Sequence, residues 1–192
     1  MIRVAAPSDR ERVIGILSAS FDANPAVNDT VPVGAGRERR MRVLMEYLVD
    51  TAYAKRGVYL SDDFSTAALL YDPVRYPDTF KDTLRQLRLV HRCIGWSRLN
   101  YAAAKDKKMR SYRPSAPHLY LSMIGTAPEA QGKGAGSQMI AFIQQLAKQE
   151  AKSIYLETSV MKNVEMYKRK GFVVHGDWKI REDYHVHFMN WK

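Results

Sequence analysis

The second half of the chain alternates predicted strands with predicted helices, and this order constrains the fold more than any other feature. An apolar strand over His118–Thr126 leads through a glycine-rich turn, Gln131–Gly136, into a helix that ends near Glu150. Four further elements follow as strand, short helix, strand and strand, at Ser153–Thr158, Asn163–Lys170, Gly171–Gly176 and Tyr184–Asn190. Helices placed between strands pack on the faces of a sheet, so this order predicts a mixed or partly parallel sheet with helices on its faces.

The first half predicts less regular elements. These are a strand at Ile2–Ala5, a helix from Pro7 to about Phe21, a helix at Arg37–Arg56, hairpin strands at Val58–Ser61 and Thr66–Tyr71, and a helix from Pro77. Turn residues such as Pro25, Pro32 and Gly34 run through residues 22–36, so we expect a loop there. The pattern over residues 95–113 is less clear, although a helix is compatible with it.

Length and composition bound the class of protein. A chain of 192 residues with 46% hydrophobic types suits one folded domain, 1–192, and is unlike a disordered chain. The single cysteine, Cys93, excludes an intrachain disulfide, and no run approaches the roughly 18 apolar residues of a spanning helix. With no secretory signal visible at the N-terminus, these features predict a cytoplasmic protein with no membrane partner.

Most of the net charge of +10 lies in residues 81–113, where ten basic residues face two acidic ones. Helical spacing predicts a basic stripe beside a largely apolar one: Lys81, Arg85, Arg88 and Arg92, next to Phe80, Leu84, Leu87, His91 and Ile94. The basic stripe is interpreted either as a solvated helix face or as a surface for an anionic partner. No known nucleic-acid-binding motif accompanies it.

The turn Gln131–Gly136 has the chemistry of an anion site. Alternating glycines allow positive φ angles and bring backbone amides close to a ligand. The following helix begins with unpaired N–H groups and a positive dipole end, which suit a phosphate, and Lys133 adds a full charge. A tight strand–helix turn without a ligand is the alternative. The spacing matches neither a P-loop nor a dinucleotide fingerprint.

Residues 118–172 resemble the signature half of the GNAT superfamily of acyl-CoA-dependent N-acetyltransferases. The matching residues are the strand Leu119–Ile124, Thr126-Ala127-Pro128, Gln131…Gly134…Gly136, Leu156-Glu157-Thr158-Ser159, Asn163, Tyr167 and Gly171-Phe172. The resemblance implies a central mixed, mostly antiparallel, strongly twisted sheet with a splayed parallel pair of strands and helices on both faces. It also implies acetyl-CoA as donor and a primary amine of a small molecule or peptide as acceptor, joined by direct attack in a ternary complex.

Within the superfamily, the chain is most similar to puromycin N-acetyltransferase-like members. This likeness rests on Phe21–Pro25, Gly125–Ser137, Leu156–Ser159 and Phe188-Met189. Residues 70–115 do not match, and such segments usually build the acceptor pocket, so the identity of the amine stays open. Two other classes also stay open: a catalytically silent acyl-CoA-binding module, and nucleic-acid binding through residues 81–113.

The resemblance implies a set of cofactor-binding residues. Main-chain groups of Ile124, Gly125 and Thr126 would pair with the pantetheine arm and the carbonyl oxygen. Asn163 would face the pantetheine arm or help to position the cofactor, and Tyr167 also belongs to the cofactor-binding set. The amides of the turn would hold the pyrophosphate: Gln131, Gly132, Lys133, Gly134, Ala135 and Gly136. For Asn163, an N-cap of the following helix is the alternative.

Two residues are candidates for proton transfer. Tyr167 is the expected general acid, because a phenol with a pKa of about 10 stays protonated at neutral pH. Glu157 is the expected base, either directly or through a water. The alternative interpretation of Tyr167 is core packing, and that of Glu157 is a solvent-facing position on the strand. Cys93 lies outside the matching region, so an acyl-cysteine route has no support. His185 and His187 lack a third ligand, so no metal is expected.

Overall fold

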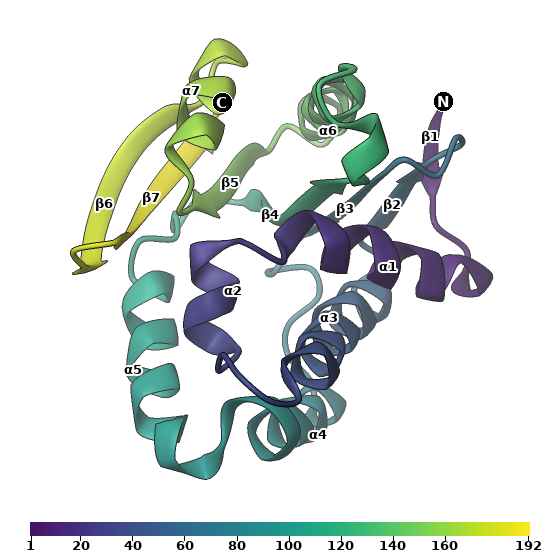
Figure 1. Cartoon of the computed structure of the whole chain (residues 1–192). Helices are drawn as coiled ribbons and strands as arrows, with labels where there is room; N and C mark the ends of the chain where they lie inside the picture. Colours follow the sequence, from purple (N-terminus) through teal and green to yellow (C-terminus); the bar gives the residue numbers. More distant parts are fainter.

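The computed structural model describes residues 1–192, which form a seven-stranded sheet between helices (Figure 1). The strands are β1 (Ile2–Val4), β2 (Val58–Ser61), β3 (Thr66–Tyr71), β4 (His118–Thr126), β5 (Ser153–Thr158), β6 (Val173–Arg181) and β7 (Tyr184–Trp191). Their order in the sheet is β1-β2-β3-β4-β5-β7-β6. All neighbours are antiparallel except β4 and β5. The predicted mixed, mostly antiparallel sheet is therefore confirmed, as is the hairpin of β2 and β3.

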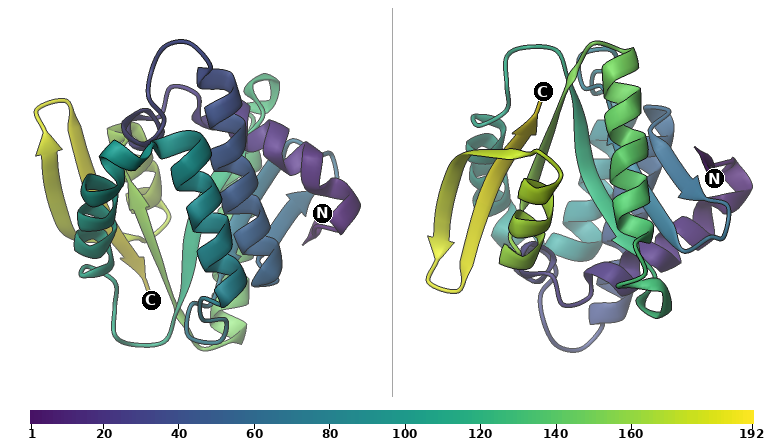
Figure 2. Two further views of the ribbon diagram at one scale, coloured as in Figure 1. Left: turned by 90° about the horizontal axis from the view of Figure 1, so that it is seen from below. Right: turned by 90° about the horizontal axis from the view of Figure 1, so that it is seen from above.

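Helices cover both faces of the sheet (Figure 2). They are α1 (Arg10–Phe21), α2 (Pro25–Thr30), α3 (Arg37–Ala54), α4 (Phe80–Leu89), α5 (Leu99–Arg110), α6 (Ala135–Gln149) and α7 (Met161–Arg169). One buried cluster joins α1 and α3 to β2 and β3, and a second joins α6 and α7 to β4 and β5. None of the helices is long and apolar enough to cross a membrane.

The parallel strands β4 and β5 separate part-way along their length. Their pairing runs from His118 opposite Ser153 to Leu121 opposite Leu156 and stops there. β4 continues to Thr126 and remains paired with β3 on its other side. The expected splayed pair is thus present, and it opens the sheet between Ser122 of β4 and Glu157 of β5.

The segment expected to be a loop, residues 22–36, contains α2. The helix is initiated by Asn24, whose side chain accepts a hydrogen bond from the Ala26 amide at 2.9 Å, and by Pro25 in the first turn. Asn and Pro are common in loops, yet in this order they also form a helix N-terminus. The same composition therefore supports either structure, and tertiary packing decides. The less clear stretch at residues 95–113 contains α5.

The apolar stripe of α4 does not face the core. Phe80 is 75% exposed, and Leu84 and Leu87 are 50% and 48% exposed. Asp82 is buried instead, because it accepts hydrogen bonds from the backbone N–H and the hydroxyl of Thr79, both at 2.7 Å. This N-terminal box sets the rotation of the helix, and Leu89, with Val90 and Cys93 just beyond it, packs inward.

Candidate active site

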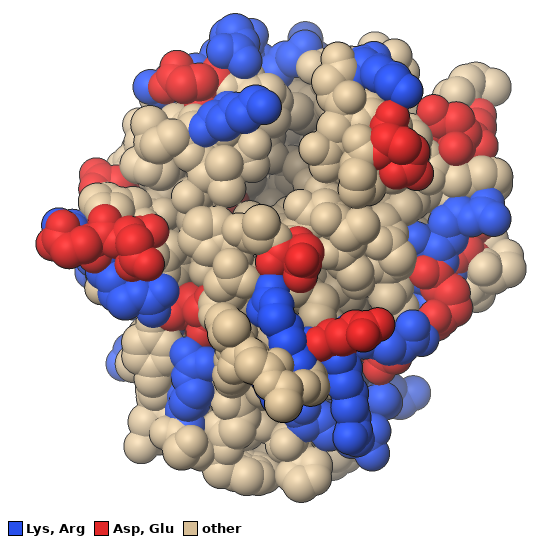
Figure 3. All heavy atoms as spheres, viewed as in Figure 1, with Lys and Arg blue, Asp and Glu red and all other residues tan.

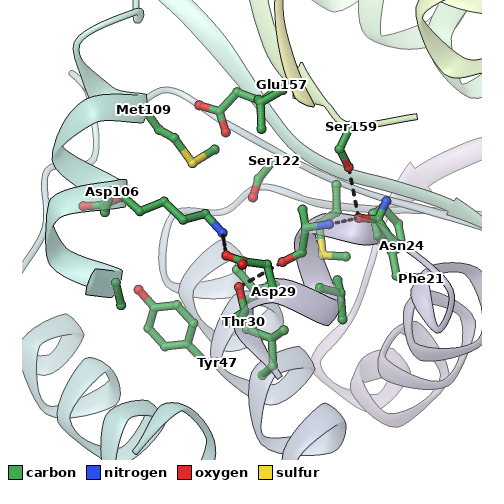
Figure 4. Close-up of a pocket in the computed structure, with 18 of the residues that line it drawn as sticks. Phe21, Asn24, Asp29, Thr30, Tyr47, Asp106, Met109, Ser122, Glu157 and Ser159 are labelled. Atoms are coloured by element: carbon green, nitrogen blue, oxygen red, sulfur yellow. Dashed lines mark hydrogen bonds and ion pairs between the residues drawn. The ribbon is translucent and has the colours of Figure 1, made fainter. Parts of the chain in front are cut away.

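A cavity of about 510 Å³ lies where β4 and β5 separate. Its walls come from α2, from α3, from the segment that carries α4 and α5, and from the splayed ends of the two strands. α7 and β7 complete it. Figure 4 shows side chains from these separate elements pointing into one space, with Glu157 on one side and Tyr47 and Asp29 on another. The cavity therefore connects the gap between the separated strands β4 and β5 to the helical insertion, which is the segment with α4 and α5 that lies between β3 and β4 in the chain.

Four of the predicted site residues line this cavity: Ile124, Glu157, Asn163 and Tyr167. They come from β4, β5 and α7, so the fold brings together residues that are up to 43 positions apart in sequence. Asn163 is the third residue of α7, whose N-cap is Val160, so the N-cap interpretation of Asn163 is wrong. Its amide side chain is instead available on the cavity side of α7.

Tyr167 combines a packing position with access to the cavity. Its ring meets that of Phe172 edge-on at 5.3 Å between centroids, within the cluster beneath α6 and α7. Burial raises the pKa of the Tyr167 phenol above its usual value. The hydroxyl is therefore protonated throughout the physiological range, and both the packing and the proton-donor interpretation are compatible with this placement.

Glu157 lies in a polar group at the point of separation. Its carboxylate accepts hydrogen bonds from Tyr120 at 3.1 Å and Tyr155 at 3.0 Å, and the Arg113 guanidinium lies 3.9 Å away. Burial raises the pKa of Glu157, and the nearby Arg113 and the two phenols oppose that rise only in part. Its side chain is only 11% exposed, so the solvent-facing interpretation of Glu157 is wrong.

The glycine-rich turn lies outside the cavity, between β4 and α6. Gly132 and Gly134 have φ angles of 77° and 87°, and a Cβ atom at either would meet nothing within 4 Å. Positive φ, rather than crowding, explains these two glycines. The Gln131 side chain donates to the Thr126 carbonyl at 3.1 Å and ties the turn to the strand end. Ala135 and Gly136 then begin α6, whose first amides are free of helical partners.

Gly125 is explained by packing. A Cβ atom there would come within 2.9 Å of Ser20 Cβ and 3.0 Å of Leu17 Cδ2, so only glycine lets α1 lie against β4. Figure 3 shows the molecular surface recessed between α6 and α7. Thr126 completes the strand and its hydroxyl lies 3.1 Å from that of Thr66.

Comparison with known proteins now decides the family. The model of the acetyltransferase (GNAT) family matches residues 76–172, about half of the chain. The chain belongs to the GNAT family. The match includes both the splayed strands and the helical insertion that walls the cavity.

A relative in sequence agrees with membership of this family, and solved structures share the fold. An uncharacterised N-acetyltransferase of Schizosaccharomyces pombe is 30% identical over 145 residues, which are 71% of this chain and 58% of the relative. The chain thus spans less than two thirds of that relative's length. A Corynebacterium glutamicum structure of histone acetyltransferase HPA2 and related acetyltransferase superposes with a TM-score of 0.72 at 23% identity, covering 99% of this chain and 94% of that one. Arylalkylamine N-acetyltransferase 2 of Aedes aegypti gives 0.67 at 12%, covering 99% and 97%.

The GNAT chain contains a buried carboxylate that sequence analysis missed. The Asp29 side chain on α2 is 1% exposed and receives hydrogen bonds from Lys105 at 2.6 Å, from Tyr101 at 3.1 Å, and from Arg181. Arg98 also donates to the Asp29 carbonyl at 2.6 Å. Burial by itself would raise the pKa of Asp29, but the hydrogen bonds and positive charges of these donors outweigh it and lower the pKa. The cluster ties α5 and the end of β6 to α2.

This cluster changes the interpretation of the basic segment. The predicted basic stripe is largely a solvated face, because Lys81, Arg88 and Arg92 are exposed and Arg85 is half-buried beside Asp82. Three other basic residues of the segment lie at the cavity wall instead: Arg98 and Lys105 bind Asp29, and Arg113 lies 3.9 Å from Glu157. Sequence periodicity could not show these contacts, because Asp29 lies 69 residues from Arg98 and 76 residues from Lys105. One signal was available: Tyr155 and Glu157 are two residues apart on a strand and therefore share a face.

Proposed function

We propose that residues 1–192 form one acetyltransferase domain that transfers an acetyl group from acetyl-CoA to a primary amine by direct attack in a ternary complex. The observation that carries this proposal is the cavity at the β4–β5 splay. It contains a buried carboxylate with a raised pKa, Glu157, and a protonated phenol, Tyr167. Acetyl transfer to an amine needs these two functions, one to remove a proton and one to supply one.

The residues at the start of α6 fit a pyrophosphate. The open space around Gly132 and Gly134 leaves their amides accessible, the helix N-terminus carries a positive dipole end, and Lys133 adds a full positive charge. In the proposal the amides of Gln131 to Gly136 hold the pyrophosphate. The main chain of Ile124, Gly125 and Thr126, on the side that faces away from β3, and Asn163 contact the pantetheine arm. Acetyl-CoA, when bound, supplies the activated acyl group.

Proton transfers accompany the exchange of bonds. An amine enters as an ammonium ion, and Glu157 removes one proton so that the nitrogen lone pair can attack. The new N–C bond forms as the C–S bond breaks, and Tyr167 donates its phenolic proton to the departing sulfur. The acylated nitrogen still carries one proton more than an amide, and the loss of that proton to the Tyr167 phenolate restores the phenol. Glu157 then releases its own proton to solvent. A raised pKa makes Glu157 a stronger base than an ordinary carboxylate, and the two phenols that donate to it keep it oriented.

Cys93 supports direct attack by its position. It belongs to the buried cluster that joins α1 and α3 to β2 and β3, and it does not line the cavity. Burial raises the pKa of the Cys93 thiol to about 11, so the thiolate is scarce at neutral pH. An acyl-cysteine route would need a reactive thiolate in the cavity.

The likeness to puromycin N-acetyltransferase-like members supports a small-molecule acceptor in this proposal. The first experiment is thermal unfolding with and without acetyl-CoA. Ligand at 100 times its dissociation constant stabilises a protein by about 2.7 kcal/mol, which is a readily measured shift. A thiol-release assay with a panel of amines then tests transfer. No shift at millimolar acetyl-CoA, together with no thiol release, would contradict the proposal.

A further inference from the structure

We infer that the acceptor is a monoamine carried on a bulky, mostly apolar body, and that its nitrogen is placed at Glu157 in the cavity. This inference rests on the proposed function and specifies the class of its substrate.

The walls select an apolar body. Of the 35 residues that line the cavity, 21 are hydrophobic, so most of an occupant's surface would be covered by hydrocarbon and aromatic groups. These hydrophobic residues come from helices on both sides of the cavity and from β4 and β7, and include Phe21, Leu44, Leu48, Leu89, Met109 and Val186. A volume of about 510 Å³ is that of a site for a small organic ligand rather than for a single methylamine-sized group.

The charges select a single ammonium group. Three carboxylates line the cavity, and two of them already have close cationic partners: Asp29 has Lys105 at 2.6 Å, and Asp106 has Arg110 at 2.7 Å. Glu157 alone has no cation within hydrogen-bonding distance, since Arg113 is 3.9 Å away. One incoming ammonium can therefore be paired, and it is paired at the carboxylate next to the splayed strands.

A second positive charge on the acceptor would find no partner. Four cations line the same cavity, Arg98, Lys105, Arg110 and Arg113, so they outnumber the carboxylates. A polyamine would bring unpaired charge against them. A polypeptide acceptor would place polar backbone groups against the apolar walls, and each buried group without a partner costs free energy. Both classes are disfavoured by the same surface that suits an aromatic or aliphatic monoamine.

The test is a thiol-release assay at fixed acetyl-CoA with four amines: 2-phenylethylamine, tryptamine, ethylamine and spermidine, and with a lysine-containing peptide. Burying a ring should raise kcat/KM of the two aryl amines about 30-fold over ethylamine, and more over spermidine and the peptide. Higher kcat/KM for spermidine or the peptide than for the aryl amines would overturn the inference and leave the proposed function standing. No thiol release with any amine would overturn the proposed function, and the inference with it.

A second test compares a substitution that fills the cavity with the same substitution at an exposed position on the same helix. Ala102 lines the cavity on α5, whereas Ala104 on the same helix is exposed and does not line it. Ala102→Phe should lower the ratio of kcat/KM for tryptamine over ethylamine at least tenfold, while Ala104→Phe should leave that ratio unchanged. An intact thermal shift with acetyl-CoA shows that each variant is folded, and Leu99→Trp replaces Ala102→Phe if the latter does not fold. An unchanged ratio in a folded cavity-filling variant would overturn the inference.

Discussion

The two sides of the proposed site are built on different principles. On the donor side, residues 124–136 are contiguous, and the groups proposed to bind are main-chain amides presented by a strand end, a turn and a helix N-terminus. On the acceptor side, the cavity is lined by side chains from Phe21 to Val186, which nine helices and strands bring together. The donor side therefore depends on local backbone geometry, and the acceptor side depends on long-range packing.

The difference has a chemical reason. Every member of a family that uses one donor needs the same backbone cradle, and a few glycines in the right order specify it. An acceptor pocket must fit one amine, so its residues follow no shared spacing. The residues proposed for proton transfer, Glu157 and Tyr167, lie on elements of the signature half but line the cavity.

Removal of the base should give the largest effect. Glu157→Gln retains the size of the side chain but cannot accept a proton, so kcat/KM should fall about 10³-fold while acetyl-CoA affinity is unchanged. Steady-state kinetics and a cofactor titration measure the two quantities. Glu165→Gln, on the exposed side of α7 and paired with Lys168, is the matched control. Wild-type activity retained in Glu157→Gln would remove this residue from the mechanism.

The raised pKa of Glu157 also predicts the shape of the pH profile. Glu157 acts in its deprotonated form, so kcat/KM should rise with pH through the pKa of this group. Because burial raises that pKa above its usual value, the acidic limb should lie above the range of an exposed glutamate. A profile whose acidic limb falls at an ordinary carboxylate pKa would contradict the assignment.

The cluster around Asp29 should matter for stability rather than for chemistry. Asp29→Asn leaves Lys105 and Arg181 without their anion, and we expect a loss of about 3 kcal/mol, less than for a fully buried pair because Arg181 is half-exposed. Asp183→Asn is the control, since Asp183 also pairs with Arg181 but is 80% exposed. Urea unfolding measures both. Equal stability of the two variants would show that the cluster does not hold the cavity wall.

The same cluster predicts a pH dependence of stability. The folded-state pKa of Asp29 is lowered, so its contribution is present above the ordinary aspartate pKa of about 3.9 and is lost as pH falls through the folded value. The difference in unfolding free energy between wild type and Asp29→Asn should therefore shrink on acidification below that range. A difference that stays constant down to the acid transition would contradict this account.

A smaller effect is expected for the proton donor. Tyr167→Phe keeps the ring against Phe172, so stability should change little, whereas kcat should fall about 100-fold. Acetyl-CoA affinity should stay near that of the wild type. Tyr59→Phe, a phenol that packs on Phe142 away from the cavity, is the control. If turnover is unchanged in Tyr167→Phe, the phenol serves packing alone.

The smallest effect should come from the donor side. Lys133→Ala removes one charge from a site made mostly of amides, so KM for acetyl-CoA should rise about fivefold with kcat unchanged, and the increase should diminish at high salt. Lys81→Ala, which removes an equal charge from exposed α4, is the control. An equal rise in both variants would mean that overall charge, and not the turn, attracts the donor.

Much of the fold could be predicted from the sequence. The strand at 118–126, the glycine turn and the following helix have strong local signals, and the hairpin at 58–71 was predicted with its bounds. The helix at 25–30 was missed because Asn24-Pro25 suits a loop as well as a helix start. The orientation of α4 could not be predicted from the sequence either. The buried side chain of Asp82 bonds to Thr79 at the start of the helix, and the apolar stripe of α4 faces solvent despite its usual spacing.

The sequence by itself determined the backbone geometry of the proposed donor side, because a glycine turn followed by a helix start depends on φ angles that nearby residues set. Only the tertiary structure decided the surroundings of Glu157 and the nature of the cavity. Tyr120 reaches Glu157 from the neighbouring strand β4, and Arg113 lies 3.9 Å from it in the segment before that strand. Lys105 reaches Asp29 across 76 positions of sequence. Buried charges take their partners from whichever elements pack together, and no local pattern encodes that choice.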